Sequence, residues 1–217
     1  MNTQVQKFEK VWNDFNDPNK AVVNSNEILG NNGYSITLTV FVHGKINKEL
    51  NKLINKLKKL SPEHRYSTSD ELHITIKFIK YLPSKSDDLI LQKYVQKAKA
   101  IIESFPHFKL EINGLNHFPN VIFAQVFSSD NQIFKLHRKL CSVLPSSFPI
   151  YENENYTPHI AIVPQFKSNP SKLFDEIKRY RNHSFGELNI NKIELTKWKF
   201  PPCGKHEEIY TFELAKK

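Results

Sequence analysis

The sequence has 217 residues, a mass of 25.4 kDa and a hydrophobic content of 39%, enough for one large domain or two small ones. Its apolar runs are only a few residues long, which excludes the roughly 20 consecutive apolar residues of a membrane-spanning helix. Lysine and arginine number 31 against 22 aspartate and glutamate residues, a formal charge of +9. Such a charge attracts polyanions such as RNA or nucleotides, although many of the lysines also suit solvated helix faces.

The cysteines and the N-terminus indicate the compartment. Cys141 and Cys203 form neither a C-x-x-C motif nor a disulfide framework, which favours a reducing environment. The first residues, MNTQVQKFEKVWNDF, lack the apolar core of a secretory signal. We therefore expect a cytoplasmic protein that does not bind membranes.

The N-terminal segment predicts an amphipathic helix. Four apolar residues recur at intervals of three and four, namely Val5, Phe8, Trp12 and Phe15. The pattern stops near Pro18, a helix-ending signal. We interpret residues 1–33 as a helical extension and residues 34–217 as a single domain.

Strands and helices then alternate along the domain. The strands are predicted by YSITLTVFV, ELHITIKFI, FKLEI, VIFAQVF and HIAIV, and by two final segments at about 188–195 and 208–214. The loop NGLNHFPN separates FKLEI from VIFAQVF. The helices are predicted by a stripe from Ile46 to Leu60, a segment from Ser86 to about Ser104, a segment opened by Asp130, and residues 171–180. About seven strands and four or five helices indicate an α+β fold.

A histidine-bearing strand occurs twice. His73 begins HITIKF and Pro83-Ser84-Lys85 follows ten residues later; His159 begins HIAIVP and Pro170-Ser171-Lys172 follows eleven residues later. The offset between the two copies is 86 to 87 residues. We infer two similar lobes, each contributing one histidine.

Strand alternation places chemistry on one face of the first copy. His73, Thr75 and Lys77 share a face, and Leu72, Ile74, Ile76 and Phe78 share the other. In the second copy His159 shares its face with Ala161 and Val163. An imidazole, a hydroxyl and an ammonium group thus point together toward a predicted cleft.

Two histidines facing one phosphate suit acid–base catalysis. Imidazole titrates at about pH 6.5, so one ring can accept a proton while the other donates one. For a 2′,3′-cyclic phosphate, the first would activate water and the second would protonate the departing ribose oxygen. Thr75 and Lys77 are candidates to hold the phosphoryl oxygens.

Two aromatic residues near these motifs are candidates to stack on bases. Phe118 lies in the predicted loop, beside His117 and Pro119, and Tyr156 precedes the second histidine. Aromatic faces bind unstacked RNA bases. Because phenylalanine is abundant here, with 16 residues, core packing remains an alternative for both.

These segments together resemble the 2H phosphoesterase superfamily, in its 2′,5′ RNA ligase-like or cyclic phosphodiesterase branch. The resemblance spans about residues 34–214 and rests on ELHITIKFI, INGLNHFPNVIFAQV, YTPHIAIV and KIELTKWKFPPCGKHEEIYTFEL. It implies two pseudo-symmetric lobes of antiparallel sheet with helices outside, flanking a central cleft. It also implies that His73 and His159 are the acid and base, and that Thr75 binds phosphate.

The resemblance further implies the substrates. These are RNA or nucleotides with a 2′,3′-cyclic phosphate or a 2′,5′ linkage, processed without metal or other cofactor, and we expect a monomer. The second motif departs from the family pattern, because Ala161 replaces the usual Thr or Ser and Pro164 replaces a basic residue. Losing one hydrogen bond to an ionised phosphate costs about 1.5–3 kcal/mol, which slows an enzyme without silencing it.

Several alternatives remain at this stage. A weakened second motif is also compatible with an RNA- or nucleotide-binding module that has little or no turnover, and the enzyme class includes reversible joining of RNA through a 2′,5′ bond. Zinc is disfavoured, since the sequence has no H-E-x-x-H motif and no quartet of histidine and cysteine. Cys203 and His206 could also form a thiol nucleophile and its base. We favour the simpler interpretation that Cys203 lies in a loop between the last two strands. Nucleoside triphosphate hydrolysis lacks its glycine-rich phosphate loop.

Overall fold

A computed structural model of the chain describes residues 3–15, 17–23, 33–82, 88–200 and 205–216. The helices in these ranges are α1 (Thr3–Phe15), α2 (Gly44–Leu60), α3 (Asp88–Ile102), α4 (Gln132–Cys141) and α5 (Ser171–Arg179). The strands are β1 (Gly33–Phe41), β2 (His73–Leu82), β3 (Phe108–Phe118), β4 (Val121–Phe127), β5 (His159–Val163), β6 (Ser184–Ile190), β7 (Lys192–Phe200) and β8 (His206–Glu213). The predicted α+β class is confirmed.

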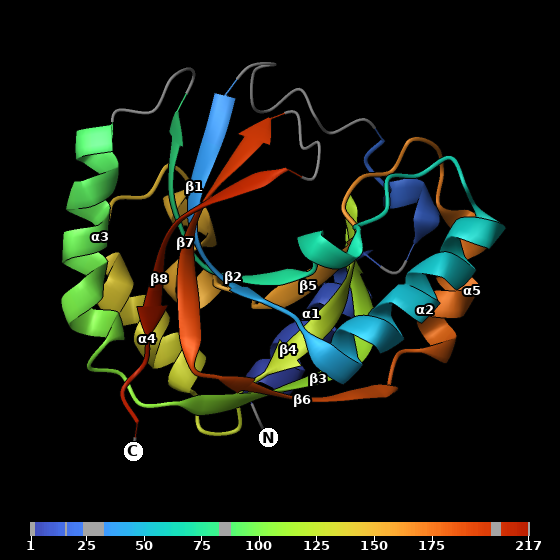
Figure 1. Cartoon of the computed structure of the whole chain (residues 1–217). Helices are drawn as coiled ribbons and strands as arrows, with labels where there is room; N and C mark the ends of the chain where they lie inside the picture. The colour runs from blue at the N-terminus through green and yellow to red at the C-terminus, as the bar shows by residue number, and fades with distance from the viewer. Residues whose placement is uncertain (1–2, 16, 24–32, 83–87, 201–204, 217) are drawn as a thin grey trace.

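The described strands form one curled antiparallel sheet in the order β6-β3-β4-β5-β2-β1-β7-β8. Its two halves, β6-β3-β4-β5 and β2-β1-β7-β8, meet at a single register pair, Ile74 with Ile160. Figure 1 shows α3 and α4 beside the half that contains β7 and β8, and α2 and α5 beside the other half. The two predicted lobes are therefore the two halves of one sheet, each covered by its own helix pair.

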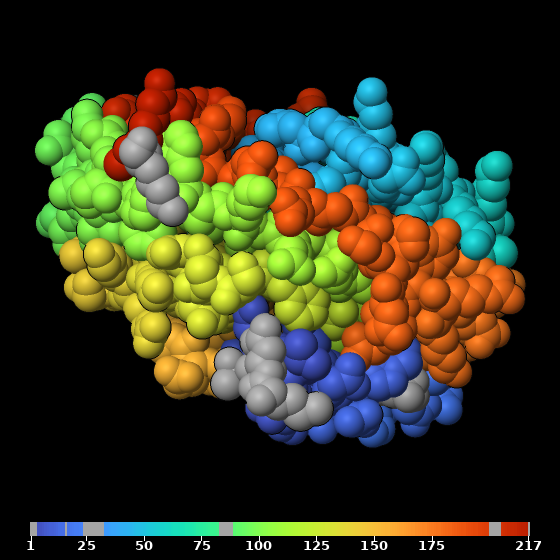
Figure 2. Space-filling view, turned by 90° about the horizontal axis from the view of Figure 1, so that it is seen from below, coloured from blue at the N-terminus to red at the C-terminus, as the bar shows by residue number. Residues whose placement is uncertain are grey.

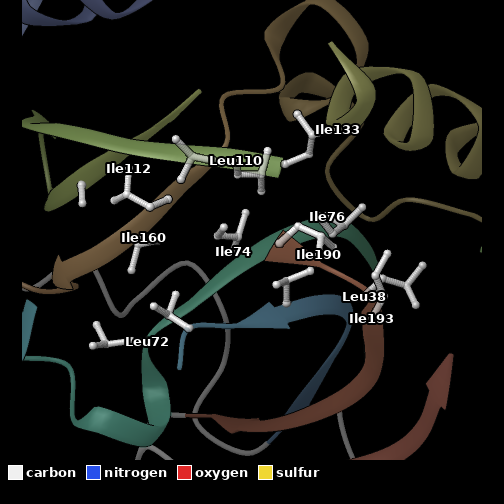
Figure 3. Packing of buried hydrophobic residues seen from close by; sticks show 14 of the residues in the cluster. Leu38, Leu72, Ile74, Ile76, Leu110, Ile112, Ile133, Ile160, Ile190 and Ile193 are labelled. Carbon is white, nitrogen blue, oxygen red and sulfur yellow. The ribbon is translucent and has the colours of Figure 1, made fainter. Parts of the chain in front are cut away.

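The core lies between the sheet and these helices. In β2 and β5 the isoleucines that follow each histidine, Ile74 and Ile160, are fully buried. Figure 3 shows them among apolar side chains from several strands and from α4. The predicted stripe of α2 is buried from Ile46 to Leu57, whereas Leu60 is 43% exposed at the end of the helix. Burying one face of these strands leaves the histidine face available for a site.

Strand β3 corrects the prediction of a loop at NGLNHFPN. The strand continues to Phe118, so only Pro119 and Asn120 separate it from β4. A bulge between Ile112 and Leu115 absorbs the irregularity, with Gly114 at a φ of 76°. A Cβ at Gly114 would lie 2.1 Å from the Arg181 carbonyl oxygen, so only glycine fits.

The C-terminal strands also differ from the prediction. The segment expected as one strand at 188–195 contains the end of β6 and the start of β7, on either side of Asn191. The segment is divided there because β6 pairs with β3 and β7 pairs with β1, in opposite halves of the sheet. Eight described strands therefore replace the expected seven.

The helices follow their predictions more closely. Helix α5 covers Ser171–Arg179, and α3 covers Asp88–Ile102, while the expected cap at Ser86 lies outside the described residues. The N-terminal helix is confirmed at Thr3–Phe15; its separation from a domain beginning at residue 34 stays a prediction. Among the described helices, none is both long and apolar enough to cross a membrane.

Candidate active site

The two repeated histidines lie at the first residues of neighbouring strands. Ile74 of β2 pairs with Ile160 of β5 in antiparallel register, so the flanking positions put His73 across from Ala161 and His159 across from Thr75. All four side chains are half-buried and lie on the face opposite the two isoleucines. Diagonal positions of such a pair are about 7–8 Å apart, which leaves room for one phosphate between the imidazoles.

Both imidazoles are oriented in the same way. The Nδ1 atom of His73 lies 2.6 Å from the Glu71 carbonyl oxygen, and that of His159 lies 2.8 Å from the Thr157 carbonyl oxygen. Because a carbonyl only accepts, Nδ1 carries the proton and donates. The Nε2 atom of each neutral ring therefore keeps a lone pair, which is the atom needed to accept a proton.

Burial favours the neutral form of both imidazoles. It lowers the pKa of His73 to about 4, although the hydrogen bond to Glu71 opposes this, and the charges of His159 and His206 lower it further. Burial also lowers the pKa of His159, against its bond to Thr157. A phosphate anion between the rings favours their charged forms and raises both pKa values. The site can therefore acquire the proton of a general acid together with its substrate.

A cavity of about 750 Å³ opens beside Thr75 and His159. Its lining includes six aromatic side chains, namely Phe15, Phe78, Phe118, Phe148, Tyr151 and Tyr156. Phe118 projects from the end of β3, with its ring edge-on to the ring of His159 at 5.4 Å. A cavity of this size, with apolar walls and a few polar groups, has the character of a small-molecule site.

Two bulges change the alternation predicted for β2. The register with β1 passes over Ile76 and Ile79, so both isoleucines are buried. Phe78, expected on the apolar face with Ile76, instead lines the cavity with Thr75 and Lys77. The prediction for Phe78 was wrong because the extra residue at Ile76 disturbs the alternation of the side chains that follow it.

Lys77 lines the cavity but does not present a free charge. Its side chain is fully buried and its ammonium group donates to the carboxylate of Glu152. Burial alone would raise the pKa of Glu152, but hydrogen bonds from Lys77 and Ser146 hold it below its ordinary value. Binding of phosphate by Lys77 stays a prediction, and Glu152 is a partner that the sequence did not indicate.

Tyr156 is largely engaged by the protein itself. Its hydroxyl donates to the Thr75 carbonyl oxygen at 2.9 Å, and its ring stacks on His137 with centroids 3.9 Å apart. His137 in turn contacts the Ile76 carbonyl oxygen through Nδ1 at 2.7 Å. These contacts join the segment before His159 to β2, so base stacking by Tyr156 stays a prediction beside a clear packing role.

Comparison with known proteins assigns the family. The family model described as the 2′-5′ RNA ligase superfamily matches residues 45–199, more than half of the chain. The chain belongs to the 2′-5′ RNA ligase superfamily. The match includes both histidine strands, and it confirms the family resemblance inferred from them.

Curated relatives and solved structures agree with this assignment. A protein named RNA 2′,3′-cyclic phosphodiesterase from Methanocaldococcus jannaschii is 26% identical over 147 residues, covering 64% of this chain and 78% of the relative. A protein of the same name from Aquifex aeolicus is 24% identical over 165 residues, covering 71% of this chain and 85% of the relative. The crystal structure of E. coli LigT with phosphate shares the fold, with a TM-score of 0.61 and 13% identity over 85% of this chain and 99% of LigT.

One departure from the superfamily pattern, Ala161, lies beside the first histidine. Ala161 is directly across the strand pair from His73, so the hydroxyl that Thr or Ser would supply at this position is absent beside His73. The hydroxyl of Thr75 lies beside His159. Pro164 follows the last residue of β5. Among the described residues, no group of three or more histidine, cysteine, aspartate or glutamate side chains is arranged to hold a metal ion.

An aromatic cluster beside His73 was not predicted. The ring of Trp198 lies 4.6 Å from that of His73, and the ring of His206 lies 4.7 Å from Trp198 and 4.6 Å from Phe41. The indole Nε1 donates to the hydroxyls of Thr196 at 2.9 Å and Thr37 at 3.1 Å. The only sequence signal is alternation along β7, which puts residues 196 and 198 on one face. Cys203, which the sequence offered as a nucleophile with His206 as its base, lies outside the described residues.

Proposed function

We propose that this protein is a phosphodiesterase that opens 2′,3′-cyclic phosphates at RNA ends by acid–base catalysis between His73 and His159, without a metal. The observation that carries the proposal is the matched pair of imidazoles, each with Nδ1 bonded to a backbone carbonyl and Nε2 left to react. The names of the curated relatives, RNA 2′,3′-cyclic phosphodiesterase, support the substrate class. The formal charge of +9 favours an anionic substrate.

The reaction needs one neutral and one protonated imidazole. The neutral Nε2 takes a proton from water as the water oxygen forms a bond to phosphorus. The bond from phosphorus to one ribose oxygen breaks, and the imidazolium of the other histidine donates its proton to that oxygen. The product is a phosphomonoester with a free hydroxyl, and the pseudo-symmetry of the strands lets either histidine fill either role.

The groups around the histidines hold the substrate. Thr75, across from His159, donates its hydroxyl to a phosphoryl oxygen, where charge increases in the transition state. Phe118 and Tyr156 form walls for the nucleoside. Lys77 also lines the cavity, where it is paired with Glu152. A 2′,5′-linked phosphodiester presents the same phosphate and two nucleosides, so it is a second substrate class for this site.

The test combines substrates with histidine variants. The protein is incubated, in excess chelator, with a 2′,3′-cyclic mononucleotide and with a short RNA that ends in a cyclic phosphate, and the products are identified. We expect turnover to persist, and to fall about 10²- to 10⁴-fold in His73→Ala and in His159→Ala. The exposed His183 supplies the matched control, and His183→Ala should retain full activity. Loss of turnover in chelator would refute the metal-free mechanism.

One observation favours a second function. Ala161 removes a phosphate ligand from one side of the site, so the protein can bind RNA or a nucleotide with little turnover. Tight binding of the RNA, with no product from wild-type protein at any pH between 5 and 8, would support this binding module over the enzyme.

A further inference from the structure

The N-terminal segment, residues 3–15 and 17–23, lies on the histidine face of the sheet. The ring of Phe8 is buried against the rings of Phe127 at 5.0 Å and Phe123 at 6.2 Å. The ring of Phe123 lies 5.1 Å from that of His159. Figure 2 shows the segment in blue along one face of the molecule, beside the orange residues of the α5 region. The segment also precedes the residues matched by the superfamily model, 45–199.

Hydrogen bonds attach this segment to two walls of the cavity. The ammonium group of Lys7 donates to the carbonyl oxygens of Glu154 at 2.6 Å and Tyr156 at 2.7 Å, just before His159. At the other end, the backbone N–H of Val22 donates to the Pro119 carbonyl oxygen at 2.7 Å, just after Phe118. The segment therefore bridges the approach to the second histidine and the turn that follows β3.

Two side chains of the segment form part of the cavity itself. Phe15, the last residue of α1, and Val22 line it together with Phe118 and Pro119. Phe15 is half-buried, and no other aromatic ring lies against it among the described residues. By contrast, Phe118 stacks on Phe123 and Phe78 packs on Phe148. Phe15 thus offers this cavity an aromatic ring that the fold does not use.

We propose that this N-terminal segment, through Phe15 and Val22, completes a nucleobase-binding pocket in which Phe15 stacks on the base of the substrate nucleotide. The pocket deepens the proposed function, on which it rests for the position of the phosphate beside Thr75 and His159. Three features support a base as the occupant. The cavity is of the size and apolar character of a small-molecule site, it adjoins the phosphate gap, and aromatic faces are the usual contacts of unstacked bases.

The test separates the base from the phosphate. Phe15→Ala is compared with Val5→Ala, a control on the same helix whose side chain is 37% exposed and does not line the cavity. Calorimetry measures binding of adenosine 2′-monophosphate and of a methyl riboside 2-phosphate that lacks the base. We expect Phe15→Ala to weaken nucleotide binding about 5- to 100-fold, the effect of losing one stacking ring, and to leave binding of the baseless phosphate unchanged. Val5→Ala should change neither, and Phe15→Trp should restore nucleotide binding.

Turnover provides an independent measurement. In wild-type protein, kcat/KM should be higher for adenosine 2′,3′-cyclic phosphate than for the baseless cyclic phosphate, and Phe15→Ala should reduce that preference by the factor by which it weakens nucleotide binding. An equal loss on both ligands, or no loss on the nucleotide, would overturn the role of Phe15. If wild-type protein opens neither cyclic phosphate but its nucleotide binding still depends on Phe15, the proposed reaction fails and the base pocket stands. Circular dichroism and the melting temperature establish that the variant is folded.

Discussion

The buried pair of Lys77 and Glu152 supports a quantitative prediction about stability. The lysine side chain is fully buried and that of Glu152 is 11% exposed, so water cannot replace either partner. Breaking such a pair by neutralising one member costs about 3–5 kcal/mol, because the other charge stays buried without a partner. In Glu152→Gln the ammonium group of Lys77 stays buried without its carboxylate partner. For a chain of this size, the melting temperature should fall by about 6–20 °C.

Urea unfolding followed by tryptophan fluorescence measures this loss. The exposed pair of Lys109 and Glu187, with side chains 65% and 58% exposed, supplies the control, and Glu187→Gln should cost about 0.2–1 kcal/mol or less. The double variant Lys77→Met with Glu152→Leu replaces the ions with apolar groups of similar size and should recover most of the stability. Equal effects of Glu152→Gln and Glu187→Gln would refute the reasoning.

The same double variant tests the role of Lys77 in binding. If the pair is structural, the variant keeps its turnover of cyclic phosphates, since no free charge was offered to the substrate. If Lys77 binds phosphate, as the sequence predicts, the folded variant loses affinity for substrate. A rise in KM with unchanged melting temperature would therefore assign Lys77 to the substrate.

Three further predictions concern single side chains. Ala161→Thr should raise kcat/KM by about tenfold, because it returns a hydroxyl across from His73, and a hydrogen bond from a hydroxyl to an anion contributes up to about 1.5–3 kcal/mol. Ala161→Val, in which valine has the shape of threonine without the hydroxyl, should not raise kcat/KM. Equal effects of the two substitutions would contradict this prediction. Trp198→Phe keeps a ring beside His73 but removes two hydrogen bonds from the indole, so unfolding free energy should drop by about 1–3 kcal/mol and the acid limb of the pH–rate profile should shift. Burial lowers the pKa of His117 to about 4, and its Nε2 has no partner among the described residues. Because the unfolded chain binds a proton at His117 more readily than the folded protein does, the free energy of unfolding should decrease by about 3 kcal/mol between about pH 6.5 and pH 4. In His117→Phe, the free energy of unfolding measured in urea should depend less on pH across this range. An unchanged pH dependence would exclude the effect.

Local sequence patterns were sufficient for the elements of the two lobes. Alternation identified both histidine strands, and the helical spacing from Ile46 to Leu57 identified the buried face of α2. Prediction failed where the backbone departs from regular geometry. The bulge at Ile76 changed the side-chain alternation before Phe78, which lines the cavity, and the bulge beside Gly114 made a glycine that reads as a loop signal part of β3.

The histidine pair was predictable because its signal is short-ranged and repeated. Each histidine precedes an isoleucine in a strand of period two, which determines the face on which it lies. Glu152 could not be found in this way, because it lies 75 residues from Lys77 in a segment without a repeating pattern. Trp198 and Phe15 reach the site through strand order and helix docking, which no local window contains.

The sequence by itself therefore determined which polar groups share a strand face, two imidazoles and a hydroxyl, because side-chain direction along a regular strand depends only on neighbouring residues. Only the tertiary structure decided which groups meet. Four of these contacts join residues that are far apart in the chain. They are the pairing of β2 with β5, the ion pair of Lys77 with Glu152, the packing of the Trp198 indole against His73, and the packing of the N-terminal helix near His159. Such contacts depend on how segments that are distant in the chain pack in the folded protein, and for that reason they leave no periodic trace in the order of the amino acids.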